Sequence, residues 1–195
     1  MHTARLRCYL TGGRPPAGGN RVYPGCRDAR MPSRSAAVEL PGSLYFATES
    51  LVWTGGRAFY DPDAGGRLWA RAHLVTAGQF ADIAAQEMYA APGRDLDIGG
   101  VLATGRAELG PGRYETLVCP GRLDGYPLLT FTAPWRMDDV APNPPSAPYL
   151  RHLAAGLLEA GSWDAPQIAG YLATRPGAAG HWTPASVSRL ITENA

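Results

Sequence analysis

The spacing of apolar and polar residues predicts helices at both ends of the chain, with strands and one further helix between them. Helical patterns occur at residues 2–11, 76–89 and 149–161, and as two short segments within 162–195. Strand signals occur at residues 36–42, 43–50, 57–63, 67–76, 113–119 and 126–133. Thr183 is the expected cap of the last helix, with Pro184 at its first position.

Glycine, proline and aspartate mark the connections between these elements. Residues 12–36 form a Gly-, Pro- and Arg-rich loop, and a loop of that length in a compact domain is expected to be functional or mobile. The turn DPDAGG at 61–66 predicts a hairpin between the strands 57–63 and 67–76. Residues 90–112 are expected to be irregular.

The order of the elements predicts an α+β fold. We expect a small mixed β-sheet that curls towards a barrel, with helices flanking it. Residues 1–160 would form the main domain, and residues 161–195 would be a C-terminal helical extension packed on it.

One charged residue of the helix expected at 76–89 falls on its apolar face. Thr76 and Gln79 form a capping box, which marks the start of the helix. At about 100° per residue, Glu87 lies near the middle of the apolar stripe, whereas Asp82 and Gln86 point away from it. The stripe consists of Phe80, Ile83 and Ala84.

Two interpretations of Glu87 remain open from this pattern. The carboxylate could sit at a solvated rim, because helix ends fray. Alternatively it is partly buried, near the negative end of the helix dipole, with a raised pKa that suits proton transfer near neutral pH.

Composition narrows the class of protein. The 195 residues are 45% hydrophobic and 18% charged, as expected of a globular chain with a real core. The formal net charge of +1 gives no general attraction to nucleic acid or to anionic membranes. The chain has neither a membrane-spanning apolar run nor a signal-peptide pattern, so we expect a cytoplasmic protein. Its three cysteines, widely spaced, are expected to be reduced thiols.

Familiar catalytic motifs do not occur in the sequence. The histidines have no metal-ligand spacing, so we expect no metal site. We interpret each as a surface residue or as one whose ring nitrogens are hydrogen-bonded within the fold; they are His2, His73, His152 and His181. GxSxG, GxGxxG and GxxxxGK[ST] are also missing, and no cofactor is expected. Two classes of protein are left: an enzyme whose acid or base is a carboxylate, and a non-catalytic binding module.

Several stretches together resemble the gamma-glutamylcyclotransferase-like superfamily, which includes bacterial BtrG-like proteins. The segment WTGGRAFYDPDAGGRLWARAHLVTAGQFADIAAQE is similar to the family core, a Gly-Gly strand followed by further strands and a helix that ends in Glu. GRYETLVC is similar to the family's later strand, and PPSAPYLRHLAAGLLEAG to the segment and helix that cover its pocket. The resemblance covers most of residues 1–160.

The resemblance implies roles for individual residues. Glu87 matches the catalytic glutamate of the family. Substrate-binding roles are implied for Tyr149, which matches the pocket Tyr after Pro-Ser, for Tyr114, which opens the later strand, and for Gly55 and Gly56 before the strand that lines the cavity. For both tyrosines, packing in the core with the hydroxyl at the surface is the alternative.

In the family, the α-amine of a γ-glutamyl group attacks its own γ-carbonyl, forming 5-oxoproline and releasing an amine. The resemblance therefore implies a small γ-glutamyl amine or amide as the substrate, with Glu87 as general acid and base. The family signature, a strand followed by Tyr-Gly-Ser-Asn, would lie before Met1, so we expect this chain to keep the base and to lack that oxyanion loop.

Two alternatives to the enzyme remain open. The first is a non-catalytic protein of the same fold that binds a small molecule or a partner. The second is a DNA contact through the C-terminal helices, which resemble a helix-turn-helix segment. Residues 165–191 carry only Arg175 and Arg189 as basic residues, so nucleic acid is the less favoured partner.

Overall fold

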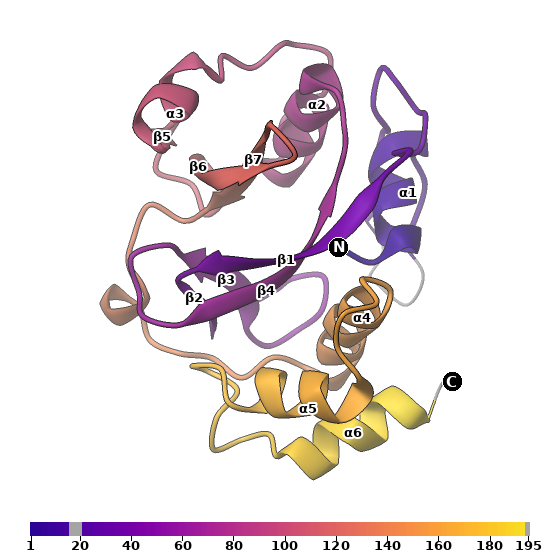
Figure 1. Cartoon of the computed structure of the whole chain (residues 1–195), viewed down its shortest axis with the longest axis vertical. Coiled ribbons are helices and arrows are strands. Elements are labelled where there is room, and N and C mark those ends of the chain that lie inside the picture. Colours follow the sequence, from indigo (N-terminus) through magenta and orange to yellow (C-terminus); the bar gives the residue numbers. More distant parts are fainter. Residues whose placement is uncertain (16–20, 194–195) are drawn as a thin grey trace.

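The computed structural model describes residues 1–15 and 21–193, and it is an α+β protein (Figure 1). Its described strands form three separate antiparallel sheets of two, two and three strands. The expectation of one mixed sheet that curls towards a barrel is therefore wrong. The strands within residues 35–73 lie between two groups of elements, the helices and strands of residues 77–132 at one end and the helices of residues 147–192 at the other.

The first four strands form a bent ribbon. β1 (Ser35–Pro41) pairs with β4 (Arg67–His73), and β2 (Ser43–Ala47) pairs with β3 (Arg57–Asp61). At the bend, Gly42 has a φ of 105°, and a Cβ there would lie 2.3 Å from the Asp61 carbonyl oxygen. Only glycine fits so close an approach with that backbone.

The hairpin expected at 61–66 is wrong, although the four strands themselves are confirmed. β3 and β4 pair with different partners, so the turn between them is the outer corner of the bend. The Asp61 carboxylate accepts hydrogen bonds from the Asp63 and Ala64 amides and fixes this corner. The chain reverses instead in residues 48–56, between β2 and β3.

The helices expected near residues 2–11 and 76–89 are confirmed as α1 (Thr3–Thr11) and α2 (Ala77–Glu87). The capping box of α2 is present, because the Thr76 hydroxyl accepts from the Gln79 amide and the Gln79 side chain accepts from the Thr76 amide. The long loop after α1 packs on α2 through residues 21–31; its residues 16–20 lie outside the described part of the chain.

Residues 90–112 are less irregular than expected. They contain the short helix α3 (Gly99–Thr104) and the strand β5 (Arg106–Glu108), which pairs with β6 (Thr116–Leu123). The strands expected at 113–119 and 126–133 are confirmed as β6 and β7 (Tyr126–Thr132), and these two strands pair with each other. Local propensity is weak in α3 because the helix begins with two glycines, whereas burial of Val101 against Phe80 and Leu117 holds it in place.

The C-terminal helices are α4 (Ala147–Leu158), α5 (Ala165–Ala173) and α6 (Pro184–Thr192), which confirms the predicted helices. They share one core with β2, and this core includes Phe46, Leu150 and Ile168. None of the helices in residues 1–15 and 21–193 combines the length and apolar composition that crossing a membrane requires.

Candidate functional site

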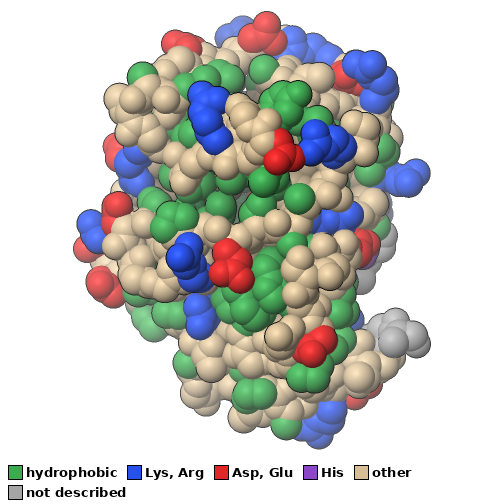
Figure 2. Space-filling model, in the orientation of Figure 1, with side chains coloured by type: hydrophobic (Ala, Val, Ile, Leu, Met, Phe, Trp, Pro, Cys, Tyr) green, Lys and Arg blue, Asp and Glu red, His purple; other side chains and the backbone are tan. Residues whose placement is uncertain are grey.

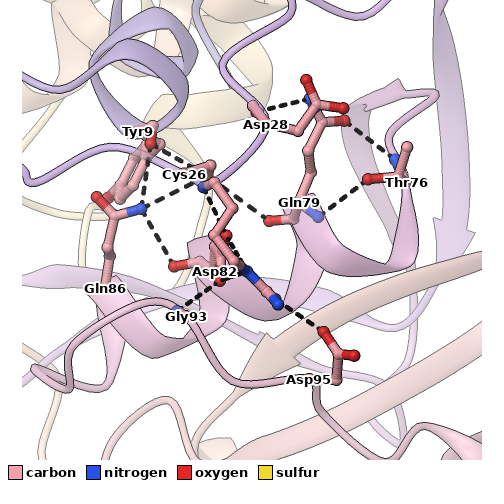
Figure 3. Close-up of polar contacts among 10 residues, drawn as sticks. Tyr9, Cys26, Asp28, Thr76, Gln79, Asp82, Gln86, Gly93 and Asp95 are labelled. Carbon is pink, nitrogen blue, oxygen red and sulfur yellow. Dashed lines mark hydrogen bonds and ion pairs between the residues drawn. The ribbon is translucent and has the colours of Figure 1, made fainter.

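Helix α2 is buried on two faces, which fixes the position of its last residue. Its apolar face packs on the core through Phe80, Ile83 and Ala84. Asp82 and Gln86 do point away from that face, but they are buried rather than exposed, because the loop of residues 21–31 covers them. Figure 3 shows these contacts.

The polar face of α2 is held by hydrogen bonds to the loop and to α1. The Gln79 side chain donates to the Arg30 carbonyl (2.8 Å), and the Gln86 side chain donates to the Tyr9 carbonyl (3.1 Å). Asp82 accepts from both the amide and the Nε of Arg27. Helix α2 is thus fastened along its length, and Glu87 projects from a rigid element.

Glu87 lies where two pockets adjoin. The smaller pocket has a volume of about 40 Å³ and also contacts Arg5, Trp53 and Tyr149. The larger one has a volume of about 460 Å³ and opens towards Trp135 and residues 111–115. The residues that line both pockets are Arg57, Glu87, Tyr89 and Tyr114.

The environment of Glu87 favours its neutral form. Its side chain is only 14% exposed, which argues against the solvated rim. Burial raises the pKa of the carboxyl group, and Arg5, whose Nη2 lies 3.7 Å from Oε1, partly offsets that rise. The result is a shielded carboxyl group with a raised pKa, as proton transfer near neutral pH requires.

Both Tyr114, just before β6, and Tyr149, in α4, line the smaller pocket, and both hydroxyls contact the backbone of Ala58 in β3. The Tyr149 hydroxyl accepts from the Ala58 amide (3.3 Å), and the Tyr114 hydroxyl donates to the Ala58 carbonyl (3.4 Å). Burial raises the pKa of both phenols. Both therefore stay protonated at neutral pH and can act as hydrogen-bond donors.

Gly55 and Gly56 lie outside the residues that line the two pockets. They let the proline-rich segment 142–146 pack against the start of β3, because a Cβ on Gly56 would lie 1.9 Å from the Asn143 carbonyl oxygen. Their amides are already used: Gly55 donates to Glu49 and Gly56 to Pro144. The resemblance implies that Gly55 and Gly56 contact the substrate, but their position in the structure gives no support for that contact.

Two arginines that sequence reasoning missed complete the pocket. Arg5 donates through Nη2 to the hydroxyls of Tyr9 (3.0 Å) and Tyr23 (2.9 Å), which aims its guanidinium at Glu87. Arg57, the first residue of β3, is 5% exposed. The sequence places Arg57 on the same strand face as Phe59 and Arg5 beside the apolar face of α1, but it does not show that their charges are buried.

The other residue types that often carry catalysis, histidine and cysteine, form no comparable site among the described residues. Among residues 1–15 and 21–193, no group of three or more His, Cys, Asp and Glu side chains could hold a metal ion. His152 stacks on Trp53 with 5.2 Å between ring centroids, and burial lowers its pKa to about 3. Cys8, Cys26 and Cys119 are free thiols.

The charges do not form a basic surface on the face shown in Figure 2, where acidic and basic side chains are interspersed. Arg175, one of the two basic residues of the less favoured DNA contact, lies over the Tyr171 ring at 4.6 Å and donates to the Tyr171 carbonyl. The tail packs into the core through Ile168, Leu172 and Val187. This arrangement gives the C-terminal helices a structural role.

Comparisons of the chain with family models, with curated proteins and with solved structures gave no significant match. The function is therefore inferred from the geometry of the pocket and from the residues that line it.

Proposed function

We propose that this protein is a gamma-glutamylcyclotransferase-like enzyme, with the corresponding fold, that converts a γ-glutamyl amine or amide to 5-oxoproline and a free amine. The observation that carries the proposal is the position of Glu87, a shielded carboxyl group with a raised pKa at the junction of two pockets. Such a group matches the proton transfers of this reaction.

In the proposed reaction, ionised Glu87 accepts a proton from the α-ammonium of the substrate. The free amine then adds to the γ-carbonyl carbon, which closes a five-membered ring and forms a tetrahedral intermediate. Protonated Glu87 next donates that proton to the leaving nitrogen, and the ring nitrogen loses its second ammonium proton to water. The carbon–nitrogen bond breaks, and 5-oxoproline and the amine are released. A single carboxyl group serves both transfers and returns to its starting state.

Tyr149 is the best placed donor for the oxyanion of that intermediate. Its oxygen accepts from the Ala58 amide, and within the described ranges its own hydroxyl hydrogen has no protein acceptor. A protonated phenol held by a backbone amide is preorganised, and donors of this kind contribute to stabilising an oxyanion. Tyr114 donates to Ala58 and would position the wall of the pocket.

The experiment is a turnover assay of 5-oxoproline release from a panel of γ-glutamyl amines. Glu87→Gln keeps the shape of the side chain but cannot carry a proton, so turnover should fall by about 10²- to 10⁴-fold. Glu108→Gln is the matched control, because Glu108 is an exposed residue of β5 outside both pockets. Equal turnover in wild type and Glu87→Gln would rule out the assigned role.

A non-catalytic protein of the same fold is the second candidate. It is favoured by one observation: the Gly55 and Gly56 amides are already bonded, so they offer no backbone cradle for an oxyanion. A protein of this kind would bind γ-glutamyl compounds in calorimetry while wild type and Glu87→Gln release 5-oxoproline at the same background rate.

A further inference from the structure

Arg57 is a buried cation whose counter-ion is missing from the described part of the protein. The residue is 5% exposed, and its Nε has no hydrogen-bond partner. Across residues 1–15 and 21–193, no carboxylate oxygen lies within 4.0 Å of its guanidinium, and the guanidinium donates no hydrogen bond. A guanidinium stays charged at any physiological pH, so it cannot escape the cost of burial by losing a proton.

The other shielded arginines differ in this respect. Arg71 pairs with Glu159 and donates to Ser35, and Arg5 is held by two tyrosine hydroxyls near Glu87. One nitrogen of each also has no partner among the described residues, Arg5 Nη1 and Arg71 Nε, but other nitrogens of both arginines are bonded within the fold. Arg57 has no comparable contact, yet it lines both pockets.

We infer that Arg57 binds a carboxylate of the ligand, and specifically the α-carboxylate of a γ-glutamyl substrate. This inference rests on the proposed function. The planar guanidinium matches a carboxylate through two parallel hydrogen bonds. Arg57 and Glu87 line the same two pockets, as recognition of an α-amino acid group requires, because the ammonium and the carboxylate are attached to one carbon.

This assignment gives the two charged residues complementary tasks. Glu87 exchanges a proton with the α-amine, while Arg57 holds the carboxylate and fixes which way the α-carbon faces. Tyr114 and Tyr149 lie close enough for the Arg57 charge to lower their pKa values against the larger effect of burial. Arg57 is thus a substrate-binding residue at the same junction.

The test is binding of two small molecules that differ in one group, 5-oxo-L-proline and 2-pyrrolidinone, which is the same ring without the carboxylate. Wild type should bind 5-oxoproline at least about tenfold more tightly, since charge-assisted hydrogen bonds contribute at that scale. Arg57→Gln should abolish the preference, and Arg57→Lys should restore part of it. Arg67→Gln, a change at the exposed first residue of β4, is the control and should keep it.

Three results would overturn the inference. Arg57→Gln could bind 5-oxoproline as tightly as wild type does. Inorganic phosphate could bind wild type more tightly than 5-oxoproline and lose its binding in Arg57→Gln, which would assign the site to a phosphate. A large fall in the Tm of ligand-free Arg57→Gln would assign Arg57 a structural role, whereas an unpartnered charge predicts an unchanged or higher Tm.

Turnover separates this inference from the proposed function. The substrate is γ-glutamyl ethylamide. If Arg57→Gln has the same KM as wild type while Glu87→Gln loses turnover, the role of Arg57 is contradicted and the proposed cyclotransferase reaction still stands. Conversely, if wild type releases no ethylamine but prefers 5-oxoproline through Arg57, the carboxylate site stands and the proposed reaction fails.

Discussion

At the scale of single residues, the pocket gathers charged groups from segments that are distant in the sequence. Arg5, Arg57 and Glu87 come from α1, β3 and α2, and all three are well shielded from water. Glu87 could be singled out from the sequence because an acid interrupts an apolar stripe. The two arginines escaped notice because a long Arg side chain usually carries its charge out to water, and only the folded structure shows that these do not.

The raised pKa of Glu87 predicts how stability varies with pH. The ordinary value is 4.5; burial raises it and Arg5 partly lowers it. Stability from the neutral carboxyl is therefore present below pH 4.5 and is lost as the pH rises through the folded value. Glu87→Gln lacks this loss, so its Tm should exceed that of wild type increasingly as the pH rises from 4.5 through the folded value, and the difference should level off above it.

Thermal melts of both proteins across this range measure the difference. Near or below the ordinary pKa the two curves should converge, because the carboxyl group is neutral in both the folded and the unfolded wild type. A wild type that is more stable than Glu87→Gln at the alkaline end would show that the Arg5 pair outweighs burial, and the raised pKa would be wrong.

Tyr149→Phe removes the proposed oxyanion donor without changing the ring. Removing a single donor of this type costs about 10²- to 10³-fold in kcat in a well-studied protease, and we expect a fall towards that range with little change in KM. Tyr114→Phe is the comparison, because its hydroxyl already donates to the Ala58 carbonyl, and it should lose less. A kcat for Tyr149→Phe equal to that of wild type would remove Tyr149 from the mechanism.

At the scale of elements, the position of Glu87 depends on how α2 is fixed. The capping box and the apolar stripe could be predicted from sequence. The burial of Asp82 and Gln86 could not, because it depends on a loop about 55 to 60 residues earlier in the chain. The bend at Gly42 escaped prediction for the same reason: DPDAGG has the local signature of a hairpin turn, and only the pairing of β4 with β1 makes it a corner.

Asp82→Asn should loosen α2 from the loop. Burial on its own raises the pKa of Asp82, but hydrogen bonds from Arg27 and the Gly93 amide hold it below the ordinary 3.8. The ionised carboxylate thus stabilises the fold above pH 3.8, and this contribution is lost as the pH falls through the lower, folded value. At neutral pH we expect a loss of about 1 to 3 kcal/mol in the free energy of unfolding.

Urea unfolding at neutral and acidic pH measures this loss. Asp95→Asn removes the other, 85% exposed partner of Arg27 and should have little effect. The advantage of wild type over Asp82→Asn should shrink in acid; an advantage that is constant with pH would show that the charge of Asp82 is not what holds the loop.

Gly56→Ala tests the close approach that seats the proline-rich segment. Its Cβ would lie 1.9 Å from a backbone oxygen of Asn143, so the segment must move, and we expect a loss of about 1 to 3 kcal/mol. Gly65→Ala is the matched control, because a Cβ at Gly65 meets no atom within 4 Å among the described residues. Equal Tm values for the two variants would contradict this packing.

At the scale of the whole molecule, the pocket exists only when the parts assemble. Tyr149 comes from α4, which shares a core with β2, α5 and α6, and Tyr149 itself packs against that core. Hydrogen bonds tie the C-terminal region to the strands, as between the Phe46 amide and the Pro176 carbonyl (2.8 Å). The sequence predicted most helices and strands from local patterns, but it could not place them, because these contacts join segments more than a hundred residues apart.

The proposed reaction requires Glu87 to change protonation near neutral pH, and a carboxyl ¹³C NMR titration measures this directly. The signal of Glu87 is the one that disappears in Glu87→Gln, and the Glu108→Gln spectrum checks the assignment. We predict a midpoint clearly above the ordinary 4.5, matched by the acidic limb of kcat/KM for 5-oxoproline release. A midpoint at or below 4.5 would mean that Glu87 is an ordinary ion-paired carboxylate, and the proposed proton transfer would be contradicted.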